Sequence, residues 1–408
     1  MYIRRYISRF WHSLAVLCLA AMTVACSDSD DDIEVAQAEE EDTVAAQAII
    51  MFYPYCGNLL SAFNNNVADM ATVALDDGYL SDNRIVVYIC QSAAKAYLIE
   101  ITDDGGKVVM DTVATETFTS PPYADAEGMA SLVERMQAIA PAESYAMIVG
   151  CHGMGWLPAG ATVSGTSAAK GTPASAGLDL ETRYFGHSSD AEWQCDISVL
   201  ADGIAATGTQ MDYILFDACY MANVEVAYEL RNATRYLIAS PAEIMAAGVP
   251  YGEAGTYLLN MNLEAFCDAF ADYYLATTTP YATIAAIDCS LVEDMAEIMS
   301  EVYATAADEV SASDLQTFDG ISPHVFYDFG NYVRALCGDD ETLLARFEDA
   351  LDALVPYSRH TPSFYSAYSK SIASIKTYSG LTVSAPSSNS AAADWAQTAW
   401  AMATLYGE

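Results

Sequence analysis

Two segments of the sequence end in residues that could carry out nucleophilic chemistry. The segment YAMIVGCHG contains His152 and closes on Gly153, and the segment YILFDAC closes on Cys219. A cysteine attacks as its thiolate, and a nearby imidazole or helix N-terminus lowers the thiol pKa. The sequence therefore predicts that Cys219 is a nucleophile with a lowered pKa and that His152 is its general base. Gly153 would leave room for substrate, and the backbone N–H groups of Gly153 and Cys219 could stabilise an oxyanion.

Each of these residues alone has an ordinary explanation. A single histidine at a strand end is more often structural than catalytic, and a cysteine in an apolar strand more often belongs to the core. Two rivals to an enzyme stay open: a catalytically silent surface lipoprotein that binds peptide or glycan with the same fold, and a metal site built from cysteine and histidine. The chain contains no Cys-x-x-Cys motif, so a zinc knuckle or thioredoxin-type motif is absent, and we assign no residue as a metal ligand.

Strands and helices alternate from residue 46 onward, and this pattern brings the two residues together. Continuous apolar runs such as NRIVVYIC, YAMIVGC and MDYILFDAC are typical of buried strands, and the stretches between them have helical spacing. The alternation predicts an α/β fold in which helices cover both faces of a mainly parallel sheet. The carboxyl ends of parallel strands meet at one edge of the sheet, so we expect His152 and Cys219 to lie close together.

Beyond residue 251 the pattern is mostly helical, as in DETLLARFEDALDALV, although TIAAIDC and SGLTVSAP resemble additional strands. We therefore divide the folded part into a core over residues 46–251 and a mostly helical region over residues 252–408 that completes the fold. Acidic residues number 55 and basic residues 16, which gives a net charge of -39. Nucleic-acid binding needs a basic surface, so this composition argues against it.

The first 45 residues have the composition of an export signal followed by a tether. Residues 1–25 combine arginines with a short apolar stretch, which is typical of a signal peptide. They lead to Cys26 in the sequence TVAC, which resembles a bacterial lipobox, so Cys26 is the predicted lipidation site. Residues 26–45 are acidic and poorly hydrophobic, which predicts a disordered tether. We expect an exported lipoprotein of the bacterial cell envelope, held at the membrane by its lipid, with the outer-membrane surface as one location.

The segments HGMGW and FDACYMANVEVAYELR resemble the catalytic segments of the clostripain family of cysteine peptidases, which are relatives of caspases and gingipains. Weaker likenesses in AIIMFYPYCGNLLSAF and YDFGNYVRAL extend the resemblance over most of residues 46–408. It implies a caspase-like α/β/α sandwich and a cysteine endopeptidase with His152 and Cys219 as its dyad. It further implies peptide or protein substrates. We expect a monomer without a cofactor, although relatives can depend on calcium.

The same resemblance bears on specificity, because the family typically cleaves after Arg or Lys and uses acidic residues in the pocket for that side chain. Asp217 matches one such position. The next loop reads ASPAEIMAAGVPY, in which Glu243 is the only acid, so Glu243 is the second candidate pocket residue. Residues 244–251 contain no acid, and this departure leaves a preference for a smaller or more apolar side chain open.

Family members are often zymogens that cut themselves between the catalytic histidine and cysteine. Residues 158–190 form a polar stretch with little periodicity at that place, and a loop of this length in a compact domain is often functional. It contains two basic residues, Lys170 and Arg183. Lys170 has small neighbours, so it is the predicted processing site, with an ordinary loop lysine as the alternative.

Overall fold

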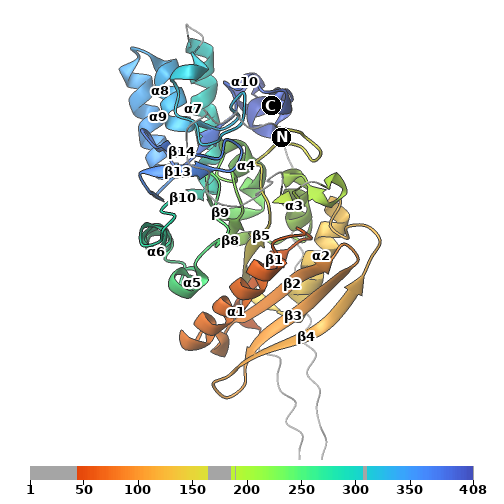
Figure 1. The fold of residues 1–408 in the computed structure, drawn as a ribbon. Coiled ribbons are helices and arrows are strands. Elements are labelled where there is room, and N and C mark those ends of the chain that lie inside the picture. Colours follow the sequence, from red (N-terminus) through yellow and green to blue (C-terminus); the bar gives the residue numbers. More distant parts are fainter. Residues whose placement is uncertain (1–43, 164–184, 189, 307–309, 408) are drawn as a thin grey trace, which may run out of the picture. The chain divides into compact units, whose positions relative to one another are not determined.

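The structure is a computed structural model that describes residues 44–163, 185–188, 190–306 and 310–407. These described residues belong to one compact unit that begins at Val44. Its centre is a nine-stranded sheet in the order β12-β10-β9-β8-β5-β1-β2-β3-β4 (Figure 1). The strands of this sheet are β1 Ala45–Tyr53, β2 Arg84–Ser92, β3 Lys95–Asp103, β4 Val108–Thr117, β5 Ala142–Gly150, β8 Met211–Asp217, β9 Thr234–Ala239, β10 Thr283–Asp288 and β12 Tyr357–His360.

The middle of the sheet is parallel and its two edges are antiparallel. Strands β9, β8, β5, β1 and β2 run parallel to one another. The β2–β3–β4 pairs at one edge and the β9–β10–β12 pairs at the other are antiparallel. The parallel strands β1, β2, β5 and β8 contain long buried apolar runs, because a strand covered on both faces has no solvent side for polar residues.

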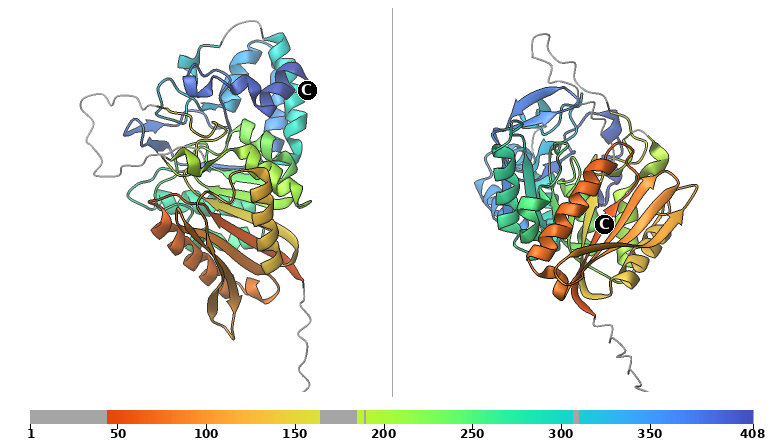
Figure 2. Two further views of the ribbon diagram at one scale, coloured as in Figure 1. Left: turned by 90° about the vertical axis from the view of Figure 1, so that its right-hand side faces the viewer. Right: turned by 60° about the horizontal axis from the view of Figure 1, so that its bottom comes forward.

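Helices cover both faces of the sheet, as Figures 1 and 2 show. On one side α1 packs against α5 and α5 against α6; on the other, α2 packs against α3, α4 against α10, and α7 against α9. The long helices carry buried apolar residues at helical spacing and polar residues on the opposite side. The helices are α1 Leu60–Asp76, α2 Ala126–Ile139, α3 Ile197–Ala206, α4 Val224–Glu229, α5 Tyr251–Leu259, α6 Leu263–Leu275, α7 Val292–Thr305, α8 Phe329–Cys337, α9 Glu341–Leu354 and α10 Ala399–Tyr406.

Three two-stranded sheets lie outside the central one. They pair β6 with β7, β11 with β15, and β13 with β14. Their bounds are β6 Phe185–Gly186, β7 Gln194–Cys195, β11 Tyr327–Asp328, β13 Ser363–Ser366, β14 Ser371–Ser374 and β15 Thr382–Val383.

The predicted α/β sandwich is confirmed, with one correction. The segment SGLTVSAP, expected to add a strand, contributes only the two residues of β15, which pair with β11 and not with the central sheet. The other expected strand, TIAAIDC, is β10 and extends the central sheet. Residues on both sides of the predicted boundary at 251 therefore build the same sheet. Among the described helices, none is both long and apolar enough to cross a bilayer.

Candidate active site

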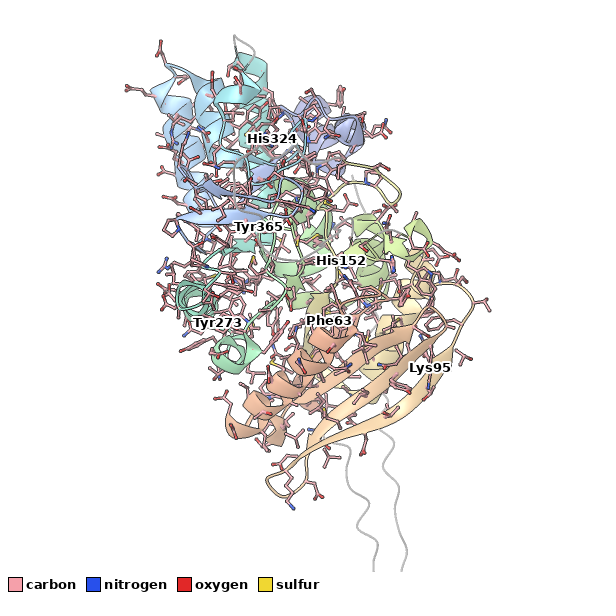
Figure 3. The ribbon with its side chains drawn as sticks, viewed as in Figure 1. Phe63, Lys95, His152, Tyr273, His324 and Tyr365 are labelled. Carbon is pink, nitrogen blue, oxygen red and sulfur yellow. The ribbon has the colours of Figure 1, made fainter. Side chains whose placement is uncertain are left out.

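His152 and Cys219 leave the sheet at neighbouring places. Strands β5 and β8 pair in parallel, and Gly150 at the end of β5 lies opposite Asp217 at the end of β8. Each candidate residue lies two positions after that pair, so the register of the two strands places both at the carboxyl ends of the parallel strands. Figure 3 labels His152 near the middle of the molecule.

The glycines after His152 allow the two strand ends to approach. A Cβ atom on Gly153 would lie 2.3 Å from the carbonyl oxygen of Cys219, and one on Gly155 would lie 2.3 Å from Nδ2 of Asn223. Both distances are far below van der Waals contact. The expectation that Gly153 leaves room for substrate therefore needs correction, because the space beside this glycine is filled by the backbone of Cys219.

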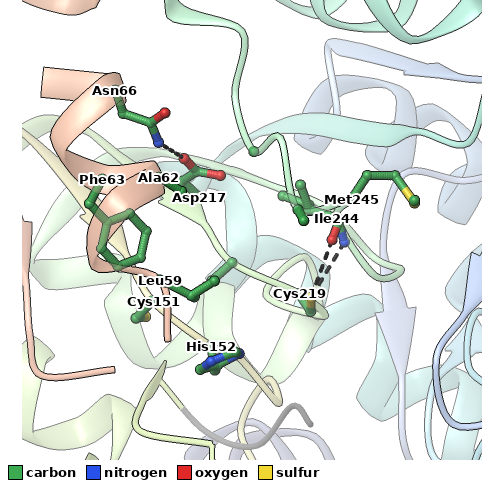
Figure 4. Close-up of a pocket in the computed structure, with 13 residues that line it drawn as sticks. Leu59, Ala62, Phe63, Asn66, Cys151, His152, Asp217, Cys219, Ile244 and Met245 are labelled. Atoms are coloured by element: carbon green, nitrogen blue, oxygen red, sulfur yellow. Dashed lines mark hydrogen bonds between the residues drawn. The ribbon is translucent and has the colours of Figure 1, made fainter. Parts of the chain in front are cut away.

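One cavity of about 50 Å³ lies between α1 and the loop after β9, and both candidate residues line it (Figure 4). This volume holds only a few water molecules. Asp217 also lines the cavity, so the structure brings together three of the residues that the sequence singled out. The full lining consists of Leu59, Ala62, Phe63, Asn66, Cys151, His152, Asp217, Ala218, Cys219, Ile244, Met245, Ala246 and Gly248.

Cys219 is 8% exposed, and its sulfur is held by the loop after β9. The N–H of Ile244 donates to Sγ at 3.4 Å, and the thiol donates to the carbonyl oxygen of Ile244 at 3.9 Å. Burial raises the pKa of the thiol, and the charge of Glu243 raises it further. The predicted lowering of the pKa is therefore wrong for this state. The helix that follows Cys219, α4, has only six residues, and its N-cap Asn223 already accepts from the N–H of Val226.

His152 is also buried, and its ring is held away from bulk solvent. Nε2 lies 2.9 Å from Oδ1 of Asn58, and the backbone of His152 pairs with that of Gly186 in β6. Burial lowers the pKa of the imidazole to about 4, and the charge of His187 adds to the effect. At neutral pH the site thus holds a neutral imidazole and a neutral thiol. Cys151, next to His152 in the chain, is buried in the core and lines the cavity as well.

Asp217 presents a buried carboxylate to the cavity from the end of β8. It is 6% exposed and accepts hydrogen bonds from Nδ2 of Asn66 at 3.0 Å, from the N–H of Val249 at 3.1 Å and from the hydroxyl of Tyr251 at 3.5 Å. Burial raises its pKa to about 7, although the bonds from Val249 and Tyr251 lower it. A Cβ on Gly248, whose φ is +69°, would lie 2.9 Å from both carboxylate oxygens.

Glu243, the second predicted pocket residue, is not among the residues that line the cavity. It is 4% exposed, and its carboxylate accepts from the hydroxyls of Tyr220 and Ser366 and from the N–H of Ala367. Two further predicted sites, Cys26 and Lys170, lie outside the residues that the structure describes.

Sequence reasoning missed several residues that complete the site. Asn58 contacts His152, Asn66 contacts Asp217, and Ile244 contacts Cys219. The two asparagines belong to the start of α1 and the turn before it, about 90 to 150 residues away from their partners along the chain. No local pattern could have signalled these contacts. Within the described ranges, no three His, Cys, Asp or Glu side chains gather so as to hold a metal ion, and the eight cysteines found there are free thiols.

Comparison with known proteins places this geometry in a family. The sequence model of the clostripain family matches residues 178–395. The structure of a secreted C11 cysteine protease from Bacteroides thetaiotaomicron, iotapain, is 39% identical, covers 88% of this chain and 99% of that chain, and has a TM-score of 0.80. No curated protein matched the chain.

Two more solved structures are similar. A clostripain from Bacteroides thetaiotaomicron in complex with the peptide inhibitor BTN-VLTK-AOMK is 45% identical, covers 55% of this chain and 100% of that chain, and has a TM-score of 0.53. An inactive zymogen C11 protease from Parabacteroides distasonis is 22% identical, covers 89% and 99% of the two chains with a TM-score of 0.73, and shares the fold. With its family match and its likeness to nearly the whole of iotapain, the chain belongs to the clostripain family and is a cysteine endopeptidase with a caspase-like fold.

Proposed function

We propose that this peptidase uses Cys219 as its nucleophile and His152 as its general base, and that Asp217 selects substrates with a basic side chain before the cut. The observation that carries the proposal is the single cavity that these three side chains line. A thiol, an imidazole and a buried carboxylate at the ends of two paired strands supply a nucleophile, a proton carrier and an anionic recognition group.

The neutral state of the two groups fits a reaction that begins with proton transfer. When a peptide binds, the thiol proton passes to the imidazole as Sγ attacks the scissile carbonyl carbon. The oxyanion that forms would accept from the backbone N–H groups of Gly153 and Cys219. His152 then donates the proton to the leaving amine, and water hydrolyses the acyl-enzyme. For this reaction Nε2 of His152 must release Oδ1 of Asn58 and approach Sγ of Cys219, while the N–H of Ile244 can stay on the sulfur.

The environment of Asp217 supports a preference for Lys or Arg. The hydrogen bonds to its carboxylate come from neutral donors. A buried carboxylate without an opposite charge is costly, and a cationic substrate side chain would supply that charge. The related clostripain was solved with an inhibitor whose peptide, VLTK, ends in lysine.

The same proposal includes export, a lipid on Cys26 and self-processing at Lys170. The signal-like residues 1–25 and the description of iotapain as secreted support export. Labelling with a fatty-acid analogue in wild type but not in Cys26→Ser would support the anchor, and equal labelling would refute it. Two fragments from the wild type, but an intact chain from Lys170→Ala, would support the processing site.

Cleavage of a mixed peptide library, read by mass spectrometry, tests the enzyme assignment. Wild type should cut after Lys or Arg, whereas Cys219→Ala and His152→Ala should leave the library intact. Cuts by Cys219→Ala at the wild-type rate would overturn the nucleophile, and cuts mainly after apolar residues would overturn the role of Asp217. If neither the intact wild type nor a form cut within residues 158–190 by an added protease cleaves any peptide, the chain is a binding protein that uses the same fold.

A further inference from the structure

Glu243 is a buried acid that the proposed mechanism does not use. It sits in the loop after β9, directly before Ile244, whose backbone N–H and carbonyl contact the thiol of Cys219. Only 4% of Glu243 is exposed, although a carboxylate is rarely buried unless it serves as a hydrogen-bond centre. Its position next to the residue that holds the nucleophile raises the question of what it fixes.

The carboxylate of Glu243 joins two distant segments. The hydroxyl of Tyr220 donates to Oε1 at 2.5 Å, and the hydroxyl of Ser366 donates to the same oxygen at 2.8 Å. The N–H of Ala367 donates to both carboxylate oxygens at 2.9 Å. Ser366 ends strand β13, the strand of Tyr365 in Figure 3, so Glu243 connects the β13–β14 hairpin to the turn that follows Cys219.

Tyr220, the residue after the nucleophile, has a backbone that needs such support. Its φ is 59°, in the left-handed region that residues other than glycine rarely adopt. Its ring stacks on Phe326 with centroids 4.9 Å apart, and its N–H donates to the carbonyl oxygen of Ala242 at 3.0 Å. An unfavourable conformation persists only where the surroundings hold it, and Glu243 supplies the bond at the far end of this side chain.

We propose that Glu243 is a positioning residue for Cys219: by tying Tyr220 to the β13–β14 hairpin, it keeps the backbone of Ile244 against the nucleophilic sulfur. The inference rests on the proposed role of Cys219 as nucleophile. It replaces the substrate-pocket role that the sequence suggested for Glu243. The residue acts through Tyr220 and Ile244 and makes no contact with the cavity.

The electrostatics of the thiol give this proposal a measurable signature. The N–H of Ile244 lowers the pKa of Cys219, whereas burial and the charges of Glu243 and Asp217 raise it. Loosening Ile244 while the charge of Glu243 stays in place should therefore raise the thiol pKa further. The titratable groups that face Cys219 or share its cavity are Glu243, Asp217, His152, Cys151 and Tyr274.

Two single substitutions loosen the tether without removing the carboxylate. Tyr220→Phe and Ser366→Ala each delete one hydroxyl donor, and each should lower kcat about tenfold with KM changed less than about twofold, since small displacements of a reacting group impair the chemical step more than binding. Because both hydroxyls bond the same oxygen, the double variant should lose less than the product of the two effects. Ser379→Ala is the matched control, because Ser379 donates in the same way to the buried carboxylate of Asp328 and neither residue lines the cavity, so its kcat should stay at the wild-type value.

A second readout does not depend on peptidase activity. The rate at which iodoacetamide alkylates Cys219, followed by mass spectrometry across pH, should show a midpoint at higher pH in Tyr220→Phe than in wild type and Ser379→Ala. Wild-type kcat and a wild-type alkylation profile in both Tyr220→Phe and Ser366→Ala would overturn the proposal, and equal losses in Ser379→Ala would reduce Glu243 to an ordinary structural acid. If wild type cleaves no peptide, the proposed function fails, and the alkylation profiles alone still decide the role of Glu243.

Discussion

Asp217 and Glu243 are two buried acids near the same thiol, and we propose different tasks for them. Both are almost fully buried, and both accept hydrogen bonds from neutral donors. Asp217 faces the cavity, whereas Glu243 faces two segments of the chain and is absent from the cavity lining. Burial and hydrogen-bond number therefore do not separate a recognition acid from a structural one. The direction in which the carboxylate points does.

Asp217→Asn should produce the largest effect that separates the two acids. We expect kcat/KM for a substrate with Lys before the cut to fall about 10³-fold, because a buried cation then loses its only opposite charge in the cavity. A matched substrate with Leu at that place should change little. Glu243→Gln should lower kcat/KM for both substrates by the same factor. A selective loss for Lys in Glu243→Gln would break the comparison.

The pH dependence of stability should give the next largest effect, and it tests whether Asp217 stays protonated in the folded protein. Its folded pKa of about 7 lies above the unfolded value, so the folded state keeps a proton that the unfolded chain has already lost between about pH 4 and 7. Stability should therefore fall as pH rises through that window. Asp217→Asn should remove about 4 kcal/mol of this fall, since the folded and unfolded pKa values differ by about three units and each unit corresponds to about 1.4 kcal/mol.

Denaturant unfolding of wild type and Asp217→Asn at several pH values between 4 and 8 provides the test. Glu225 has a pKa raised to about 7 by burial and adds a fall of the same sign, so the difference between the two proteins isolates Asp217. Parallel curves for the two proteins would show that Asp217 does not titrate in this range.

The effect of pH on substrate binding should be smaller than its effect on stability. Only the ionised carboxylate attracts a cation, so KM for the Lys substrate should fall as pH rises to about 7 and then level off. Below pH 7 the ratio of KM for Lys to KM for Leu should change by up to about tenfold per pH unit. Taking the ratio cancels the titration of His152 and Cys219, which affects both substrates alike. A ratio that is flat from pH 5.5 to 8 would contradict the assignment.

Asn66→Ala should have the smallest effect of the series. It removes one neutral donor at 3.0 Å from Asp217 and leaves Val249 and Tyr251 in place. A net hydrogen bond contributes about 1 kcal/mol, so kcat/KM for the Lys substrate should change about fivefold. Asn64→Ala, on the exposed side of α1, serves as the control and should leave kcat/KM unchanged. A loss as large as that of Asp217→Asn would mean that Asn66 itself contacts the substrate.

The sequence predicted the parallel strands and the convergence of His152 and Cys219 because both follow from local patterns. An unbroken apolar run marks a strand covered on both faces, and parallel strands end at one edge. The pairing of Gly150 with Asp217 then needs only that β5 and β8 be neighbours. The strand expected in SGLTVSAP is only the two residues of β15 and pairs with β11, because a local apolar run does not show how long a strand is or which strand it joins.

The electrostatics of the site could not be predicted from the sequence. The raised pKa of Cys219 and the lowered pKa of His152 result mainly from burial, which depends on α1 and the loop after β9 closing over the strand ends. Glu243 was assigned to the pocket because it is the only acid in its loop. The direction in which the Glu243 side chain points is set by its contacts with Tyr220 and Ser366, and Ser366 lies 123 residues away along the chain.

The most direct test of the central claim is the reaction of the full chain with a peptide chloromethyl ketone that ends in lysine, followed by peptide mapping. In this reaction the sulfur displaces chloride and forms one thioether. We predict one adduct per chain on Cys219, a slower reaction in Asp217→Asn, and no preference for lysine over a leucine ketone in that variant. An adduct on another cysteine, or equal rates with both ketones in wild type, would contradict the account.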